Sequence, residues 1–261
     1  MEKLLKKIFI SIPFKMLWEE YLLKVIENKV NPEIALDNFA LDNFGIKDFE
    51  YVAQRLHEGG LSITLHAPYM ELAPGGIDPK IRSVSLGRLH QAFDFAPIFK
   101  PFSIVCHSGY DNRCYRDNQD QWLKNSIETW TIFADRAREI GTILMIENVF
   151  EETPEILKPI FKSLYSDNFK FCFDVGHAHV FGKSPIDMWI DELSPYLGQL
   201  HLHDNKGEID DHMALGCGEI EFEKLFSILK RKNLKPIITL EAHQESWVLE
   251  SLQILKRLWP W

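Results

Sequence analysis

Short apolar runs alternate along the chain with longer amphipathic segments. Eight such runs are rich in Ile, Val, Leu and Phe and carry few charges before their last residue. They lie at residues 7–13, 33–37, 61–66, 103–107, 142–147, 170–174, 198–203 and 236–241. Runs this continuously apolar are typical of parallel strands that helices cover on both faces. The pattern therefore predicts an α/β protein built on a parallel sheet.

Most of the intervening segments have helical character. Apolar residues recur at intervals of three and four at 14–29, 78–99, 118–140, 153–165, 222–232 and 245–258. A strand and a helix repeated about eight times in 261 residues predict one domain, residues 1–261, folded as a single (β/α)8 TIM barrel. A doubly wound open sheet is the alternative, but it usually has fewer strands, and no G-x-G-x-x-G follows the first run.

Composition narrows the class of protein only slightly. Hydrophobic residues make up 46% and charged residues 26%, as in ordinary globular proteins, and the net charge of -9 argues mildly against a nucleic-acid-coating surface. No apolar run approaches the roughly 20 residues of a membrane span, and we identify no signal peptide. The four cysteines are scattered, which predicts a reducing, cytoplasmic compartment, and Cys106 and Cys172 are expected in the core.

Ligand-type residues stand at the ends of six successive strand-like runs. In a barrel, these carboxyl ends meet at one mouth, where active sites are built. A single histidine there is usually structural, but imidazoles and carboxylates converging from six strands predict a divalent metal site, because buried carboxylates need a partner or a cation. The residues concerned, at the strand ends and just after them, are His66, His107, Glu147, Asp174, His177, His201, His203, Asp210, His212 and Glu241.

Several short strings, in order, carry a family resemblance. LHAPY, HSGY, IENVF, FDVGHAH, HLHDN, D-x-H-x-x-x-G-x-G-x-I and TLEAH span most of the chain. Together they resemble the xylose isomerase-like TIM-barrel superfamily, which includes sugar and sugar-phosphate isomerases and epimerases and the endonuclease IV family of apurinic-site nucleases. The resemblance implies the same barrel fold and a metal-dependent activity.

The epimerase branch of the resemblance implies one divalent ion, commonly manganese, held by four residues. These are Glu147, Asp174, His201 and Glu241. The two glutamates would also be the catalytic acid and base that move a proton next to a carbonyl of the sugar. His177 would contact the oxygens of the substrate.

The endonuclease branch implies three zinc ions. His66, His107 and Glu147 resemble the ligands of one zinc, and Glu147 also bridges to the four-residue group shared with the epimerases. His177, Asp210 and His212 resemble the ligands of another. The resemblance thus implies zinc or manganese, at one to three ions per chain.

The loops around the mouth favour the sugar enzyme. Tyr69 matches an aromatic residue that the nucleases insert into DNA, but loop 37–45 is acidic and apolar where they have an arginine, and loop 205–211 is acidic. The epimerases have an arginine on the loop after strand seven, where this chain has Lys206-Gly207. Positive charge near the mouth comes only from Arg113, Arg116, Lys183 and Lys206.

We therefore expect a metal-dependent isomerase or epimerase of a small sugar, sugar phosphate or polyol, with an apurinic-site endonuclease as the alternative. A barrel that keeps its metal for structure or binding is a third hypothesis. The expected partner is a small carbohydrate rather than nucleic acid or a membrane, and the oligomeric state stays open.

Residues flanking the predicted ligands are candidates for the substrate pocket. Tyr69, His203 and His243 are predicted to contact substrate, the two histidines also as supports for ligands. Aromatic residues near strand ends line a sugar pocket or pack in the core, with neither alternative favoured. They are Phe14, Phe39, Phe44, Tyr69, Tyr110, Trp122 and Phe150.

Overall fold

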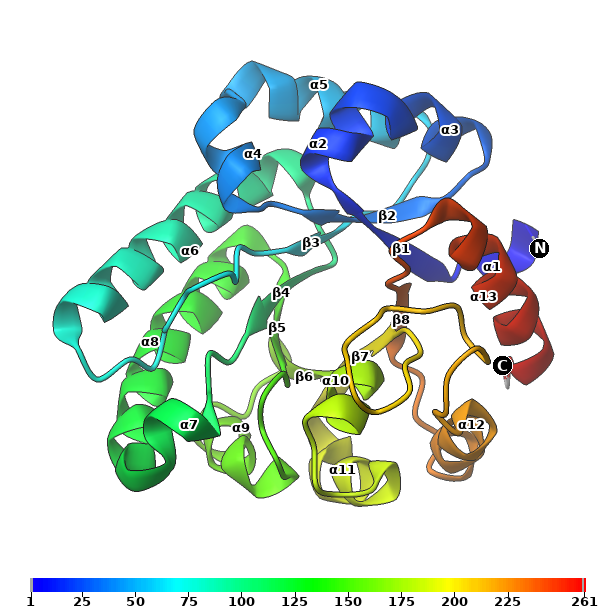
Figure 1. Ribbon diagram of the computed structural model, residues 1–261. Coiled ribbons are helices and arrows are strands. Elements are labelled where there is room, and N and C mark those ends of the chain that lie inside the picture. The colour runs from blue at the N-terminus through cyan, green and yellow to red at the C-terminus, as the bar shows by residue number, and fades with distance from the viewer. Residues whose placement is uncertain (1, 260) are drawn as a thin grey trace.

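Eight parallel strands close into a barrel in this computed structural model, which describes residues 2–259 and 261 (Figure 1). Each strand pairs with the next in sequence, and β8 returns to pair with β1. The strands are β1 (Ile8–Pro13), β2 (Asn31–Ala35), β3 (Thr64–His66), β4 (Ser103–His107), β5 (Ile143–Glu147), β6 (Phe169–Asp174), β7 (Leu197–Leu202) and β8 (Ile237–Leu240). The predicted (β/α)8 TIM barrel is confirmed.

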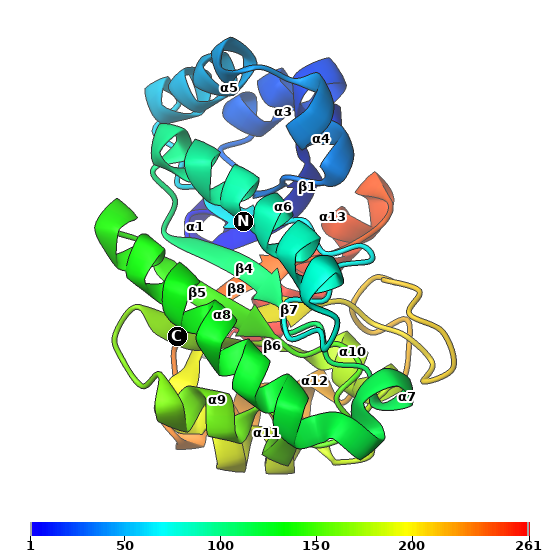
Figure 2. The same ribbon diagram turned by 90° about the vertical axis from the view of Figure 1, so that its left-hand side faces the viewer.

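Helices surround the barrel, and Figure 2 shows α6 and α8 lying side by side over β4 and β5. The α-helices are α1 (Glu2–Leu5), α2 (Phe14–Met16), α3 (Leu22–Glu27), α4 (Asn38–Asn43), α5 (Ile46–Glu58), α6 (Pro79–Phe99), α7 (Asn112–Tyr115), α8 (Gln119–Ile140), α9 (Lys158–Ser163), α10 (Val175–Val180), α11 (Ile186–Leu193), α12 (Phe222–Arg231) and α13 (Glu245–Leu258). None of these helices combines the length and the apolar composition that crossing a bilayer requires.

Some strand and helix boundaries differ from those that the sequence pattern predicts. The second strand ends at Ala35, and Asp37 instead caps α4 by accepting a hydrogen bond from the backbone N–H of Ala40 (2.7 Å). The predicted helix 14–29 is divided into α2, a π-helical segment Leu17–Tyr21, and α3. The apolar pattern did not predict the short helix α10, which follows β6 directly.

Two cores stabilise the barrel. Outside the strands, large side chains such as Phe14 and Trp122 are fully buried, so these two aromatic residues pack in the core rather than line a pocket. Inside the barrel, Val105, Met145 and Cys172 form a small apolar cluster. Cys106 is also buried, as expected from the sequence.

The loop after β7 is fastened by one buried carboxylate. Oδ2 of Asp204 accepts hydrogen bonds from the backbone N–H groups of Gly216 (2.8 Å) and Gly218 (2.9 Å), and Oδ1 accepts from those of Asn205 (2.9 Å) and Ile220 (3.2 Å). A Cβ at position 218 would lie 2.3 Å from Asp204 Oδ1, so glycine is required there. The G-x-G-x-I part of the sequence motif thus holds the loop that carries Asp210 and His212.

We expect Asp204→Ala to destabilise the fold by about 3 kcal/mol or more, because it leaves two buried backbone donors, of Asn205 and Ile220, and two part-buried ones, of Gly216 and Gly218, without an acceptor. Chemical denaturation measures the loss, and limited proteolysis should cut preferentially within residues 205–219. Asp211→Ala is the control, since Asp211 is an exposed carboxylate in the same loop and should change stability by at most about 0.5 kcal/mol. Equal effects of the two substitutions would contradict this role of Asp204.

Candidate metal centre at the barrel mouth

All nine predicted ligands lie at the carboxyl end of the barrel, in groups whose potential ligand atoms are within 4.8 Å of one another. Strand register explains part of this convergence. Pairing of β4 with β5 places His107 beside Glu147, and pairing of β6 with β7 places Asp174 beside His201.

Glu147 is at the centre of the groups. Its Oε2 lies 3.1 Å from His66 Nε2 and 3.4 Å from His107 Nε2. Its Oε1 lies 3.2 Å from His201 Nδ1 and 3.4 Å from His177 Nδ1. The two oxygens of one buried carboxylate therefore face two different sets of imidazoles, which is the arrangement of a bridging ligand.

The shared group consists of Glu147, Asp174, His201 and Glu241. His201 Nδ1 lies 3.2 Å from Glu241 Oε1 and 3.9 Å from Asp174 Oδ2. Asp174 Oδ2 is buried and has no hydrogen-bond partner among the described residues. Imidazole nitrogens and carboxylate oxygens around an unsatisfied buried oxygen fit a divalent ion such as zinc or manganese.

A further group lies under the loop after β7. Asp210 Oδ2 is 3.2 Å from both His177 Nε2 and His212 Nε2, and Asp210 Oδ1 is buried without a hydrogen-bond partner among the described residues. His212 has a positive φ of 49°, a conformation that is costly for a residue other than glycine and is found at functional sites. This group also fits a divalent ion.

His203 comes close to the same group, but its orientation favours a supporting role. Its ring is parallel to that of His212, with 3.7 Å between centroids and 2° between planes. Imidazole lone pairs lie in the ring plane, so two such stacked rings cannot both point at one ion. His203 Nε2 instead lies 3.1 Å from Asp174 Oδ1, and the buried His203 is not among the residues that line the cavity. His243 stacks on His212 at 4.3 Å.

The local sequence Asp174-Val-Gly-His177 is explained by its contacts. Asp174 caps α10 by accepting a hydrogen bond from the backbone N–H of His177 (2.6 Å). His177 Nδ1 lies 3.0 Å from the carbonyl oxygen of Asn148. A Cβ at Gly176 would lie 2.0 Å from the His203 ring, so only glycine allows His203 to reach Asp174.

Burial and neighbouring charges shift the pKa values of the ligand side chains and thereby set their protonation. Burial lowers the pKa of His107 to about 4, which keeps its imidazole neutral and able to bind a metal. Burial alone would raise the pKa of Glu147, but the positive charge of His201 and hydrogen bonds from His107 and His177 hold it well below its usual value. Glu147 is therefore a carboxylate near neutral pH.

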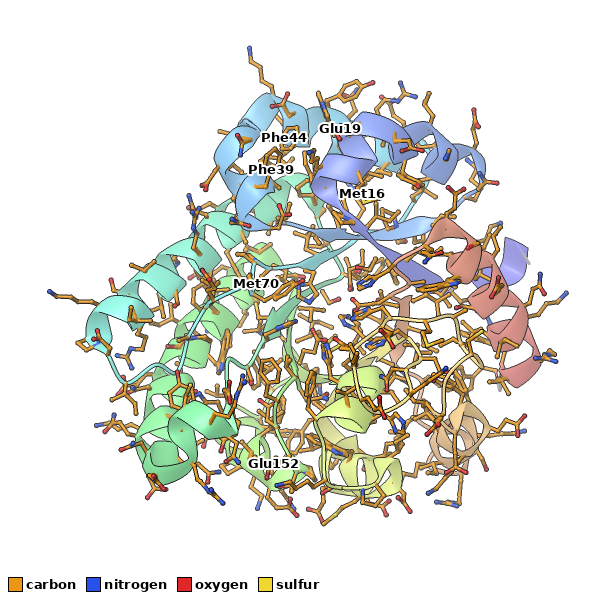
Figure 3. All side chains as sticks on the ribbon, in the orientation of Figure 1. Met16, Glu19, Phe39, Phe44, Met70 and Glu152 are labelled. Carbon is orange, nitrogen blue, oxygen red and sulfur yellow. The ribbon has the colours of Figure 1, made fainter. Side chains whose placement is uncertain are left out.

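A cavity of about 1080 Å³ opens beside these groups. His66, His107, His177, Asp210, His212 and Glu241 line its polar end. Its other walls are mostly apolar and aromatic, with Tyr69, Met70, Tyr110 and Phe150 on one side and residues of β1 and α13 on the other. Figure 3 shows Met16 and Met70 at this end of the barrel. Tyr69 stacks on His107 at 4.3 Å, and Phe39, although near the mouth, is not among the lining residues.

Lysine and arginine are scarce around the cavity. Lys24 is the one lysine or arginine among the described residues that line it, and its Nζ lies 3.2 Å from Glu20 and 3.3 Å from Glu245. The lining carboxylates are Glu71, Asp111, Asp210, Glu241 and Glu245. Of the rim cations expected from the sequence, Arg113 pairs with Asp111 (2.7 Å) and Lys183 with Glu152 (2.8 Å).

Two buried acids next to the centre escaped the sequence analysis. Glu33 lies inside the barrel with its Oε1 2.9 Å from His201 Nε2. Glu151 accepts hydrogen bonds from Ser108 Oγ and from the backbone N–H of Val149 (2.7 Å). Each resembles an ordinary charged residue at the edge of an apolar run, so no sequence signal marked it.

Comparison with known proteins agrees with the barrel fold. A family model described as xylose isomerase-like TIM barrel matches residues 30–258. The chain belongs to this family. The resemblance identified from the sequence strings is thereby confirmed.

Two curated proteins are similar to this chain in sequence. Uncharacterized protein MJ1311 of Methanocaldococcus jannaschii is 26% identical over 219 residues, covering 80% of this chain and 74% of the relative. A probable endonuclease 4 of Bacillus licheniformis is 26% identical over 223 residues, covering 74% of this chain and 70% of the relative.

Solved structures cover nearly the whole chain. The TTHB071 protein from Thermus thermophilus, soaked with ZnCl2, has a TM-score of 0.83 at 27% identity and covers 97% of this chain and 98% of that one. A D-tagatose 3-epimerase-like protein has a TM-score of 0.82 at 24% identity, with coverage of 97% and 96%, which shows a shared fold.

The buried acid Glu151 should make the stability of the fold depend on pH. Burial raises its pKa to about 7 from 4.5, so the folded state holds a proton that the unfolded state releases. Its contribution to stability is therefore full below about pH 4.5 and declines as pH rises to 7 and beyond. Glu151→Gln removes this decline, and we expect the variant to gain up to about 3 kcal/mol over wild type at pH 8 and little at pH 5.

Denaturant titrations of both proteins across this pH range measure the difference. Glu152→Gln is the control, because Lys183 lowers the pKa of the neighbouring Glu152 and its substitution should bring no gain at high pH. A wild-type minus Glu151→Gln difference that does not change with pH would contradict the prediction.

Proposed function

We propose that this barrel is a metal-dependent isomerase or epimerase of a small, uncharged sugar or polyol. The observation that carries the proposal is the wall of the cavity: beside the shared group it is mostly apolar and aromatic, and the one lysine or arginine among its described residues, Lys24, is already paired with Glu20 and Glu245. A phosphate group would find no free lysine or arginine at this wall, whereas a sugar can hydrogen-bond through its hydroxyl groups to carboxylates and imidazoles and stack its C–H face on aromatic rings. Among the substrates expected from the sequence, this favours the unphosphorylated ones.

Glu147 and Glu241 are the proposed acid and base. Their Oε1 atoms each lie 3.2 Å from His201 Nδ1, and the two residues come from different parts of the barrel, the end of β5 and the position just after β8. A divalent ion held by Glu147, Asp174, His201 and Glu241 would polarise a bound carbonyl and hydroxyl. In this proposal one glutamate takes a proton from the carbon next to the carbonyl and the other returns one from the opposite side.

The other walls would position the substrate. His177 and Tyr69 reach the cavity beside the shared group, and Tyr69 is 43% exposed, so its ring is accessible to a ligand. The solved structures similar in fold include a D-psicose 3-epimerase with D-tagatose, at 16% identity and a TM-score of 0.76, which supports a ketose as the first substrate to test.

The test measures the conversion of a panel of ketoses and polyols by the zinc- or manganese-loaded protein, with exchange of the substrate C–H proton followed by NMR in D2O. We expect Glu147→Gln and Glu241→Gln each to lower kcat at least about 100-fold, because each removes a proton-transferring group. Glu128→Gln, an exposed carboxylate paired with Arg82 on the outer helices, is the control. Near-wild-type turnover in either variant would reject the assigned roles, and no exchange with any panel member would reject the sugar substrate.

Metal-dependent hydrolysis of DNA at apurinic sites is the second candidate function. Two groups outside the shared one favour it, and we call them the outer groups. In the first, Glu147 lies near His66 and also near His177 on its other oxygen. In the second, Asp210 lies 3.2 Å from both His177 and His212. Several metal ions suit phosphodiester hydrolysis by activating water and stabilising the leaving oxygen. The shortage of free lysine and arginine side chains around the cavity opposes it, because DNA-binding proteins neutralise several phosphates with such residues.

Metal content and DNA binding separate the two candidates. If the group of His177, Asp210 and His212 binds metal, we expect His212→Ala to lower the zinc content by about one ion per chain, while the shared group stays loaded. We also expect weak binding of an abasic-site duplex, without incision, at every salt concentration. Three zinc ions together with tight binding that falls steeply with salt and incision next to the abasic site would promote the nuclease.

A further inference from the structure

We infer that Glu33 is a positioning residue for the shared group. It fixes the proton of His201 on Nε2 and thereby leaves Nδ1 as the atom available to the ion. The inference rests on the metal role proposed above and extends it to a residue inside the barrel that is not among the residues lining the substrate cavity.

Glu33 is fully buried on β2, and its two carboxylate oxygens have different surroundings. Oε2 accepts hydrogen bonds from Thr64 Oγ1 (2.8 Å), Gln199 Nε2 (2.6 Å) and Thr239 Oγ1 (3.2 Å). Oε1 receives no well-aligned hydrogen bond from any described residue, yet it lies 2.9 Å from His201 Nε2. A buried carboxylate oxygen without a donor is costly, so the N–H of His201 belongs at this position.

Gln199 leaves no other proton for His201 Nε2. Its side-chain nitrogen lies 3.2 Å from that atom, but its two hydrogens have better partners in Glu33 Oε2 and Thr239 Oγ1. Its side-chain oxygen accepts from Ser103 Oγ at 2.7 Å, which fixes the orientation of the amide. His201 Nε2 therefore has an acceptor beside it and no donor to spare, and it must carry the proton itself.

The opposite edge of the same ring faces the carboxylates. Nδ1 of His201 lies 3.2 Å from both Glu147 Oε1 and Glu241 Oε1. A metal-bound imidazole commonly donates its other N–H to a carboxylate, which fixes the tautomer and increases the basicity of the ligand atom. Glu33, His201 and the shared group have the contacts of such a carboxylate–histidine–metal arrangement.

Glu33→Gln tests the inference with little change in shape. Because Gln199 Nε2 donates toward the Oε2 position, the new amide should place its oxygen there and its NH2 toward His201 Nε2. The proton of His201 would then move to Nδ1 and block the ligand atom. We expect zinc at the shared group to bind about 10- to 100-fold more weakly, as measured by competition with a chromophoric chelator, with zinc at the other groups unchanged.

Thr64→Val is the matched control. It removes a similarly buried donor to Glu33 but leaves the contact with His201, so zinc affinity should stay within about twofold of wild type. Wild-type affinity in a folded Glu33→Gln protein, or an equal loss in Thr64→Val, would overturn the positioning role alone. Absence of zinc binding by the wild type would overturn the proposed metal function as well.

A direct measurement covers the case in which Glu33→Gln does not fold. Nitrogen-15 NMR of the zinc-loaded wild type, assigned with His201→Gln, reports which ring nitrogen carries the proton. A protonated Nε2 and an unprotonated Nδ1 support the inference, and the reverse tautomer overturns it. A purely structural role of Glu33 would not fix this signature.

Discussion

The centre of this molecule is one buried negative charge, the carboxylate of Glu147. Four imidazoles lie within 3.4 Å of its oxygens, and neither the carboxylate nor most of these rings is exposed to water. Such a cluster is stable only if every charge has a partner, because moving ions from water into a protein interior is expensive. The surrounding strands must therefore deliver their terminal residues together, and the barrel architecture does this by ending all its strands at one face.

The same constraint continues downward into the barrel and outward into the loops. Below the centre, Glu33 and its polar neighbours occupy positions where a barrel interior is more often filled by branched apolar residues. Above it, Asp204 fastens the loop that brings Asp210 and His212 to His177. Each of these layers consists of acids that accept from fixed donors, so the ligand geometry is set by hydrogen bonds as well as by packing.

Periodicity and strand-end chemistry predicted the barrel and the convergence of the candidate ligands. They succeeded because the period of apolar residues reports burial, and because parallel strands place their ends on one side by necessity. They were less accurate at boundaries such as Asp37, where a helix cap competes with strand continuation. The roles of Glu33 and Glu151 could not be predicted from the sequence, because the side chains that contact them lie on other strands and loops. The orientation of His203 relative to His212 depends on packing around Gly176, which no spacing rule encodes.

The cavity also spans the seam where the barrel closes. Its lining includes Ser11 and Pro13 on β1 and Glu241 beside β8, and the outer part of its wall is completed by hydrogen bonds from Tyr21 and Lys24 to Glu245 on α13. A ligand that fills it touches the first and last strands at once. Occupancy and ring closure are thus thermodynamically linked, since whatever binds only the closed form stabilises it by mass action. The melting temperature of the whole chain becomes a reporter for compounds that enter the mouth, independently of any turnover.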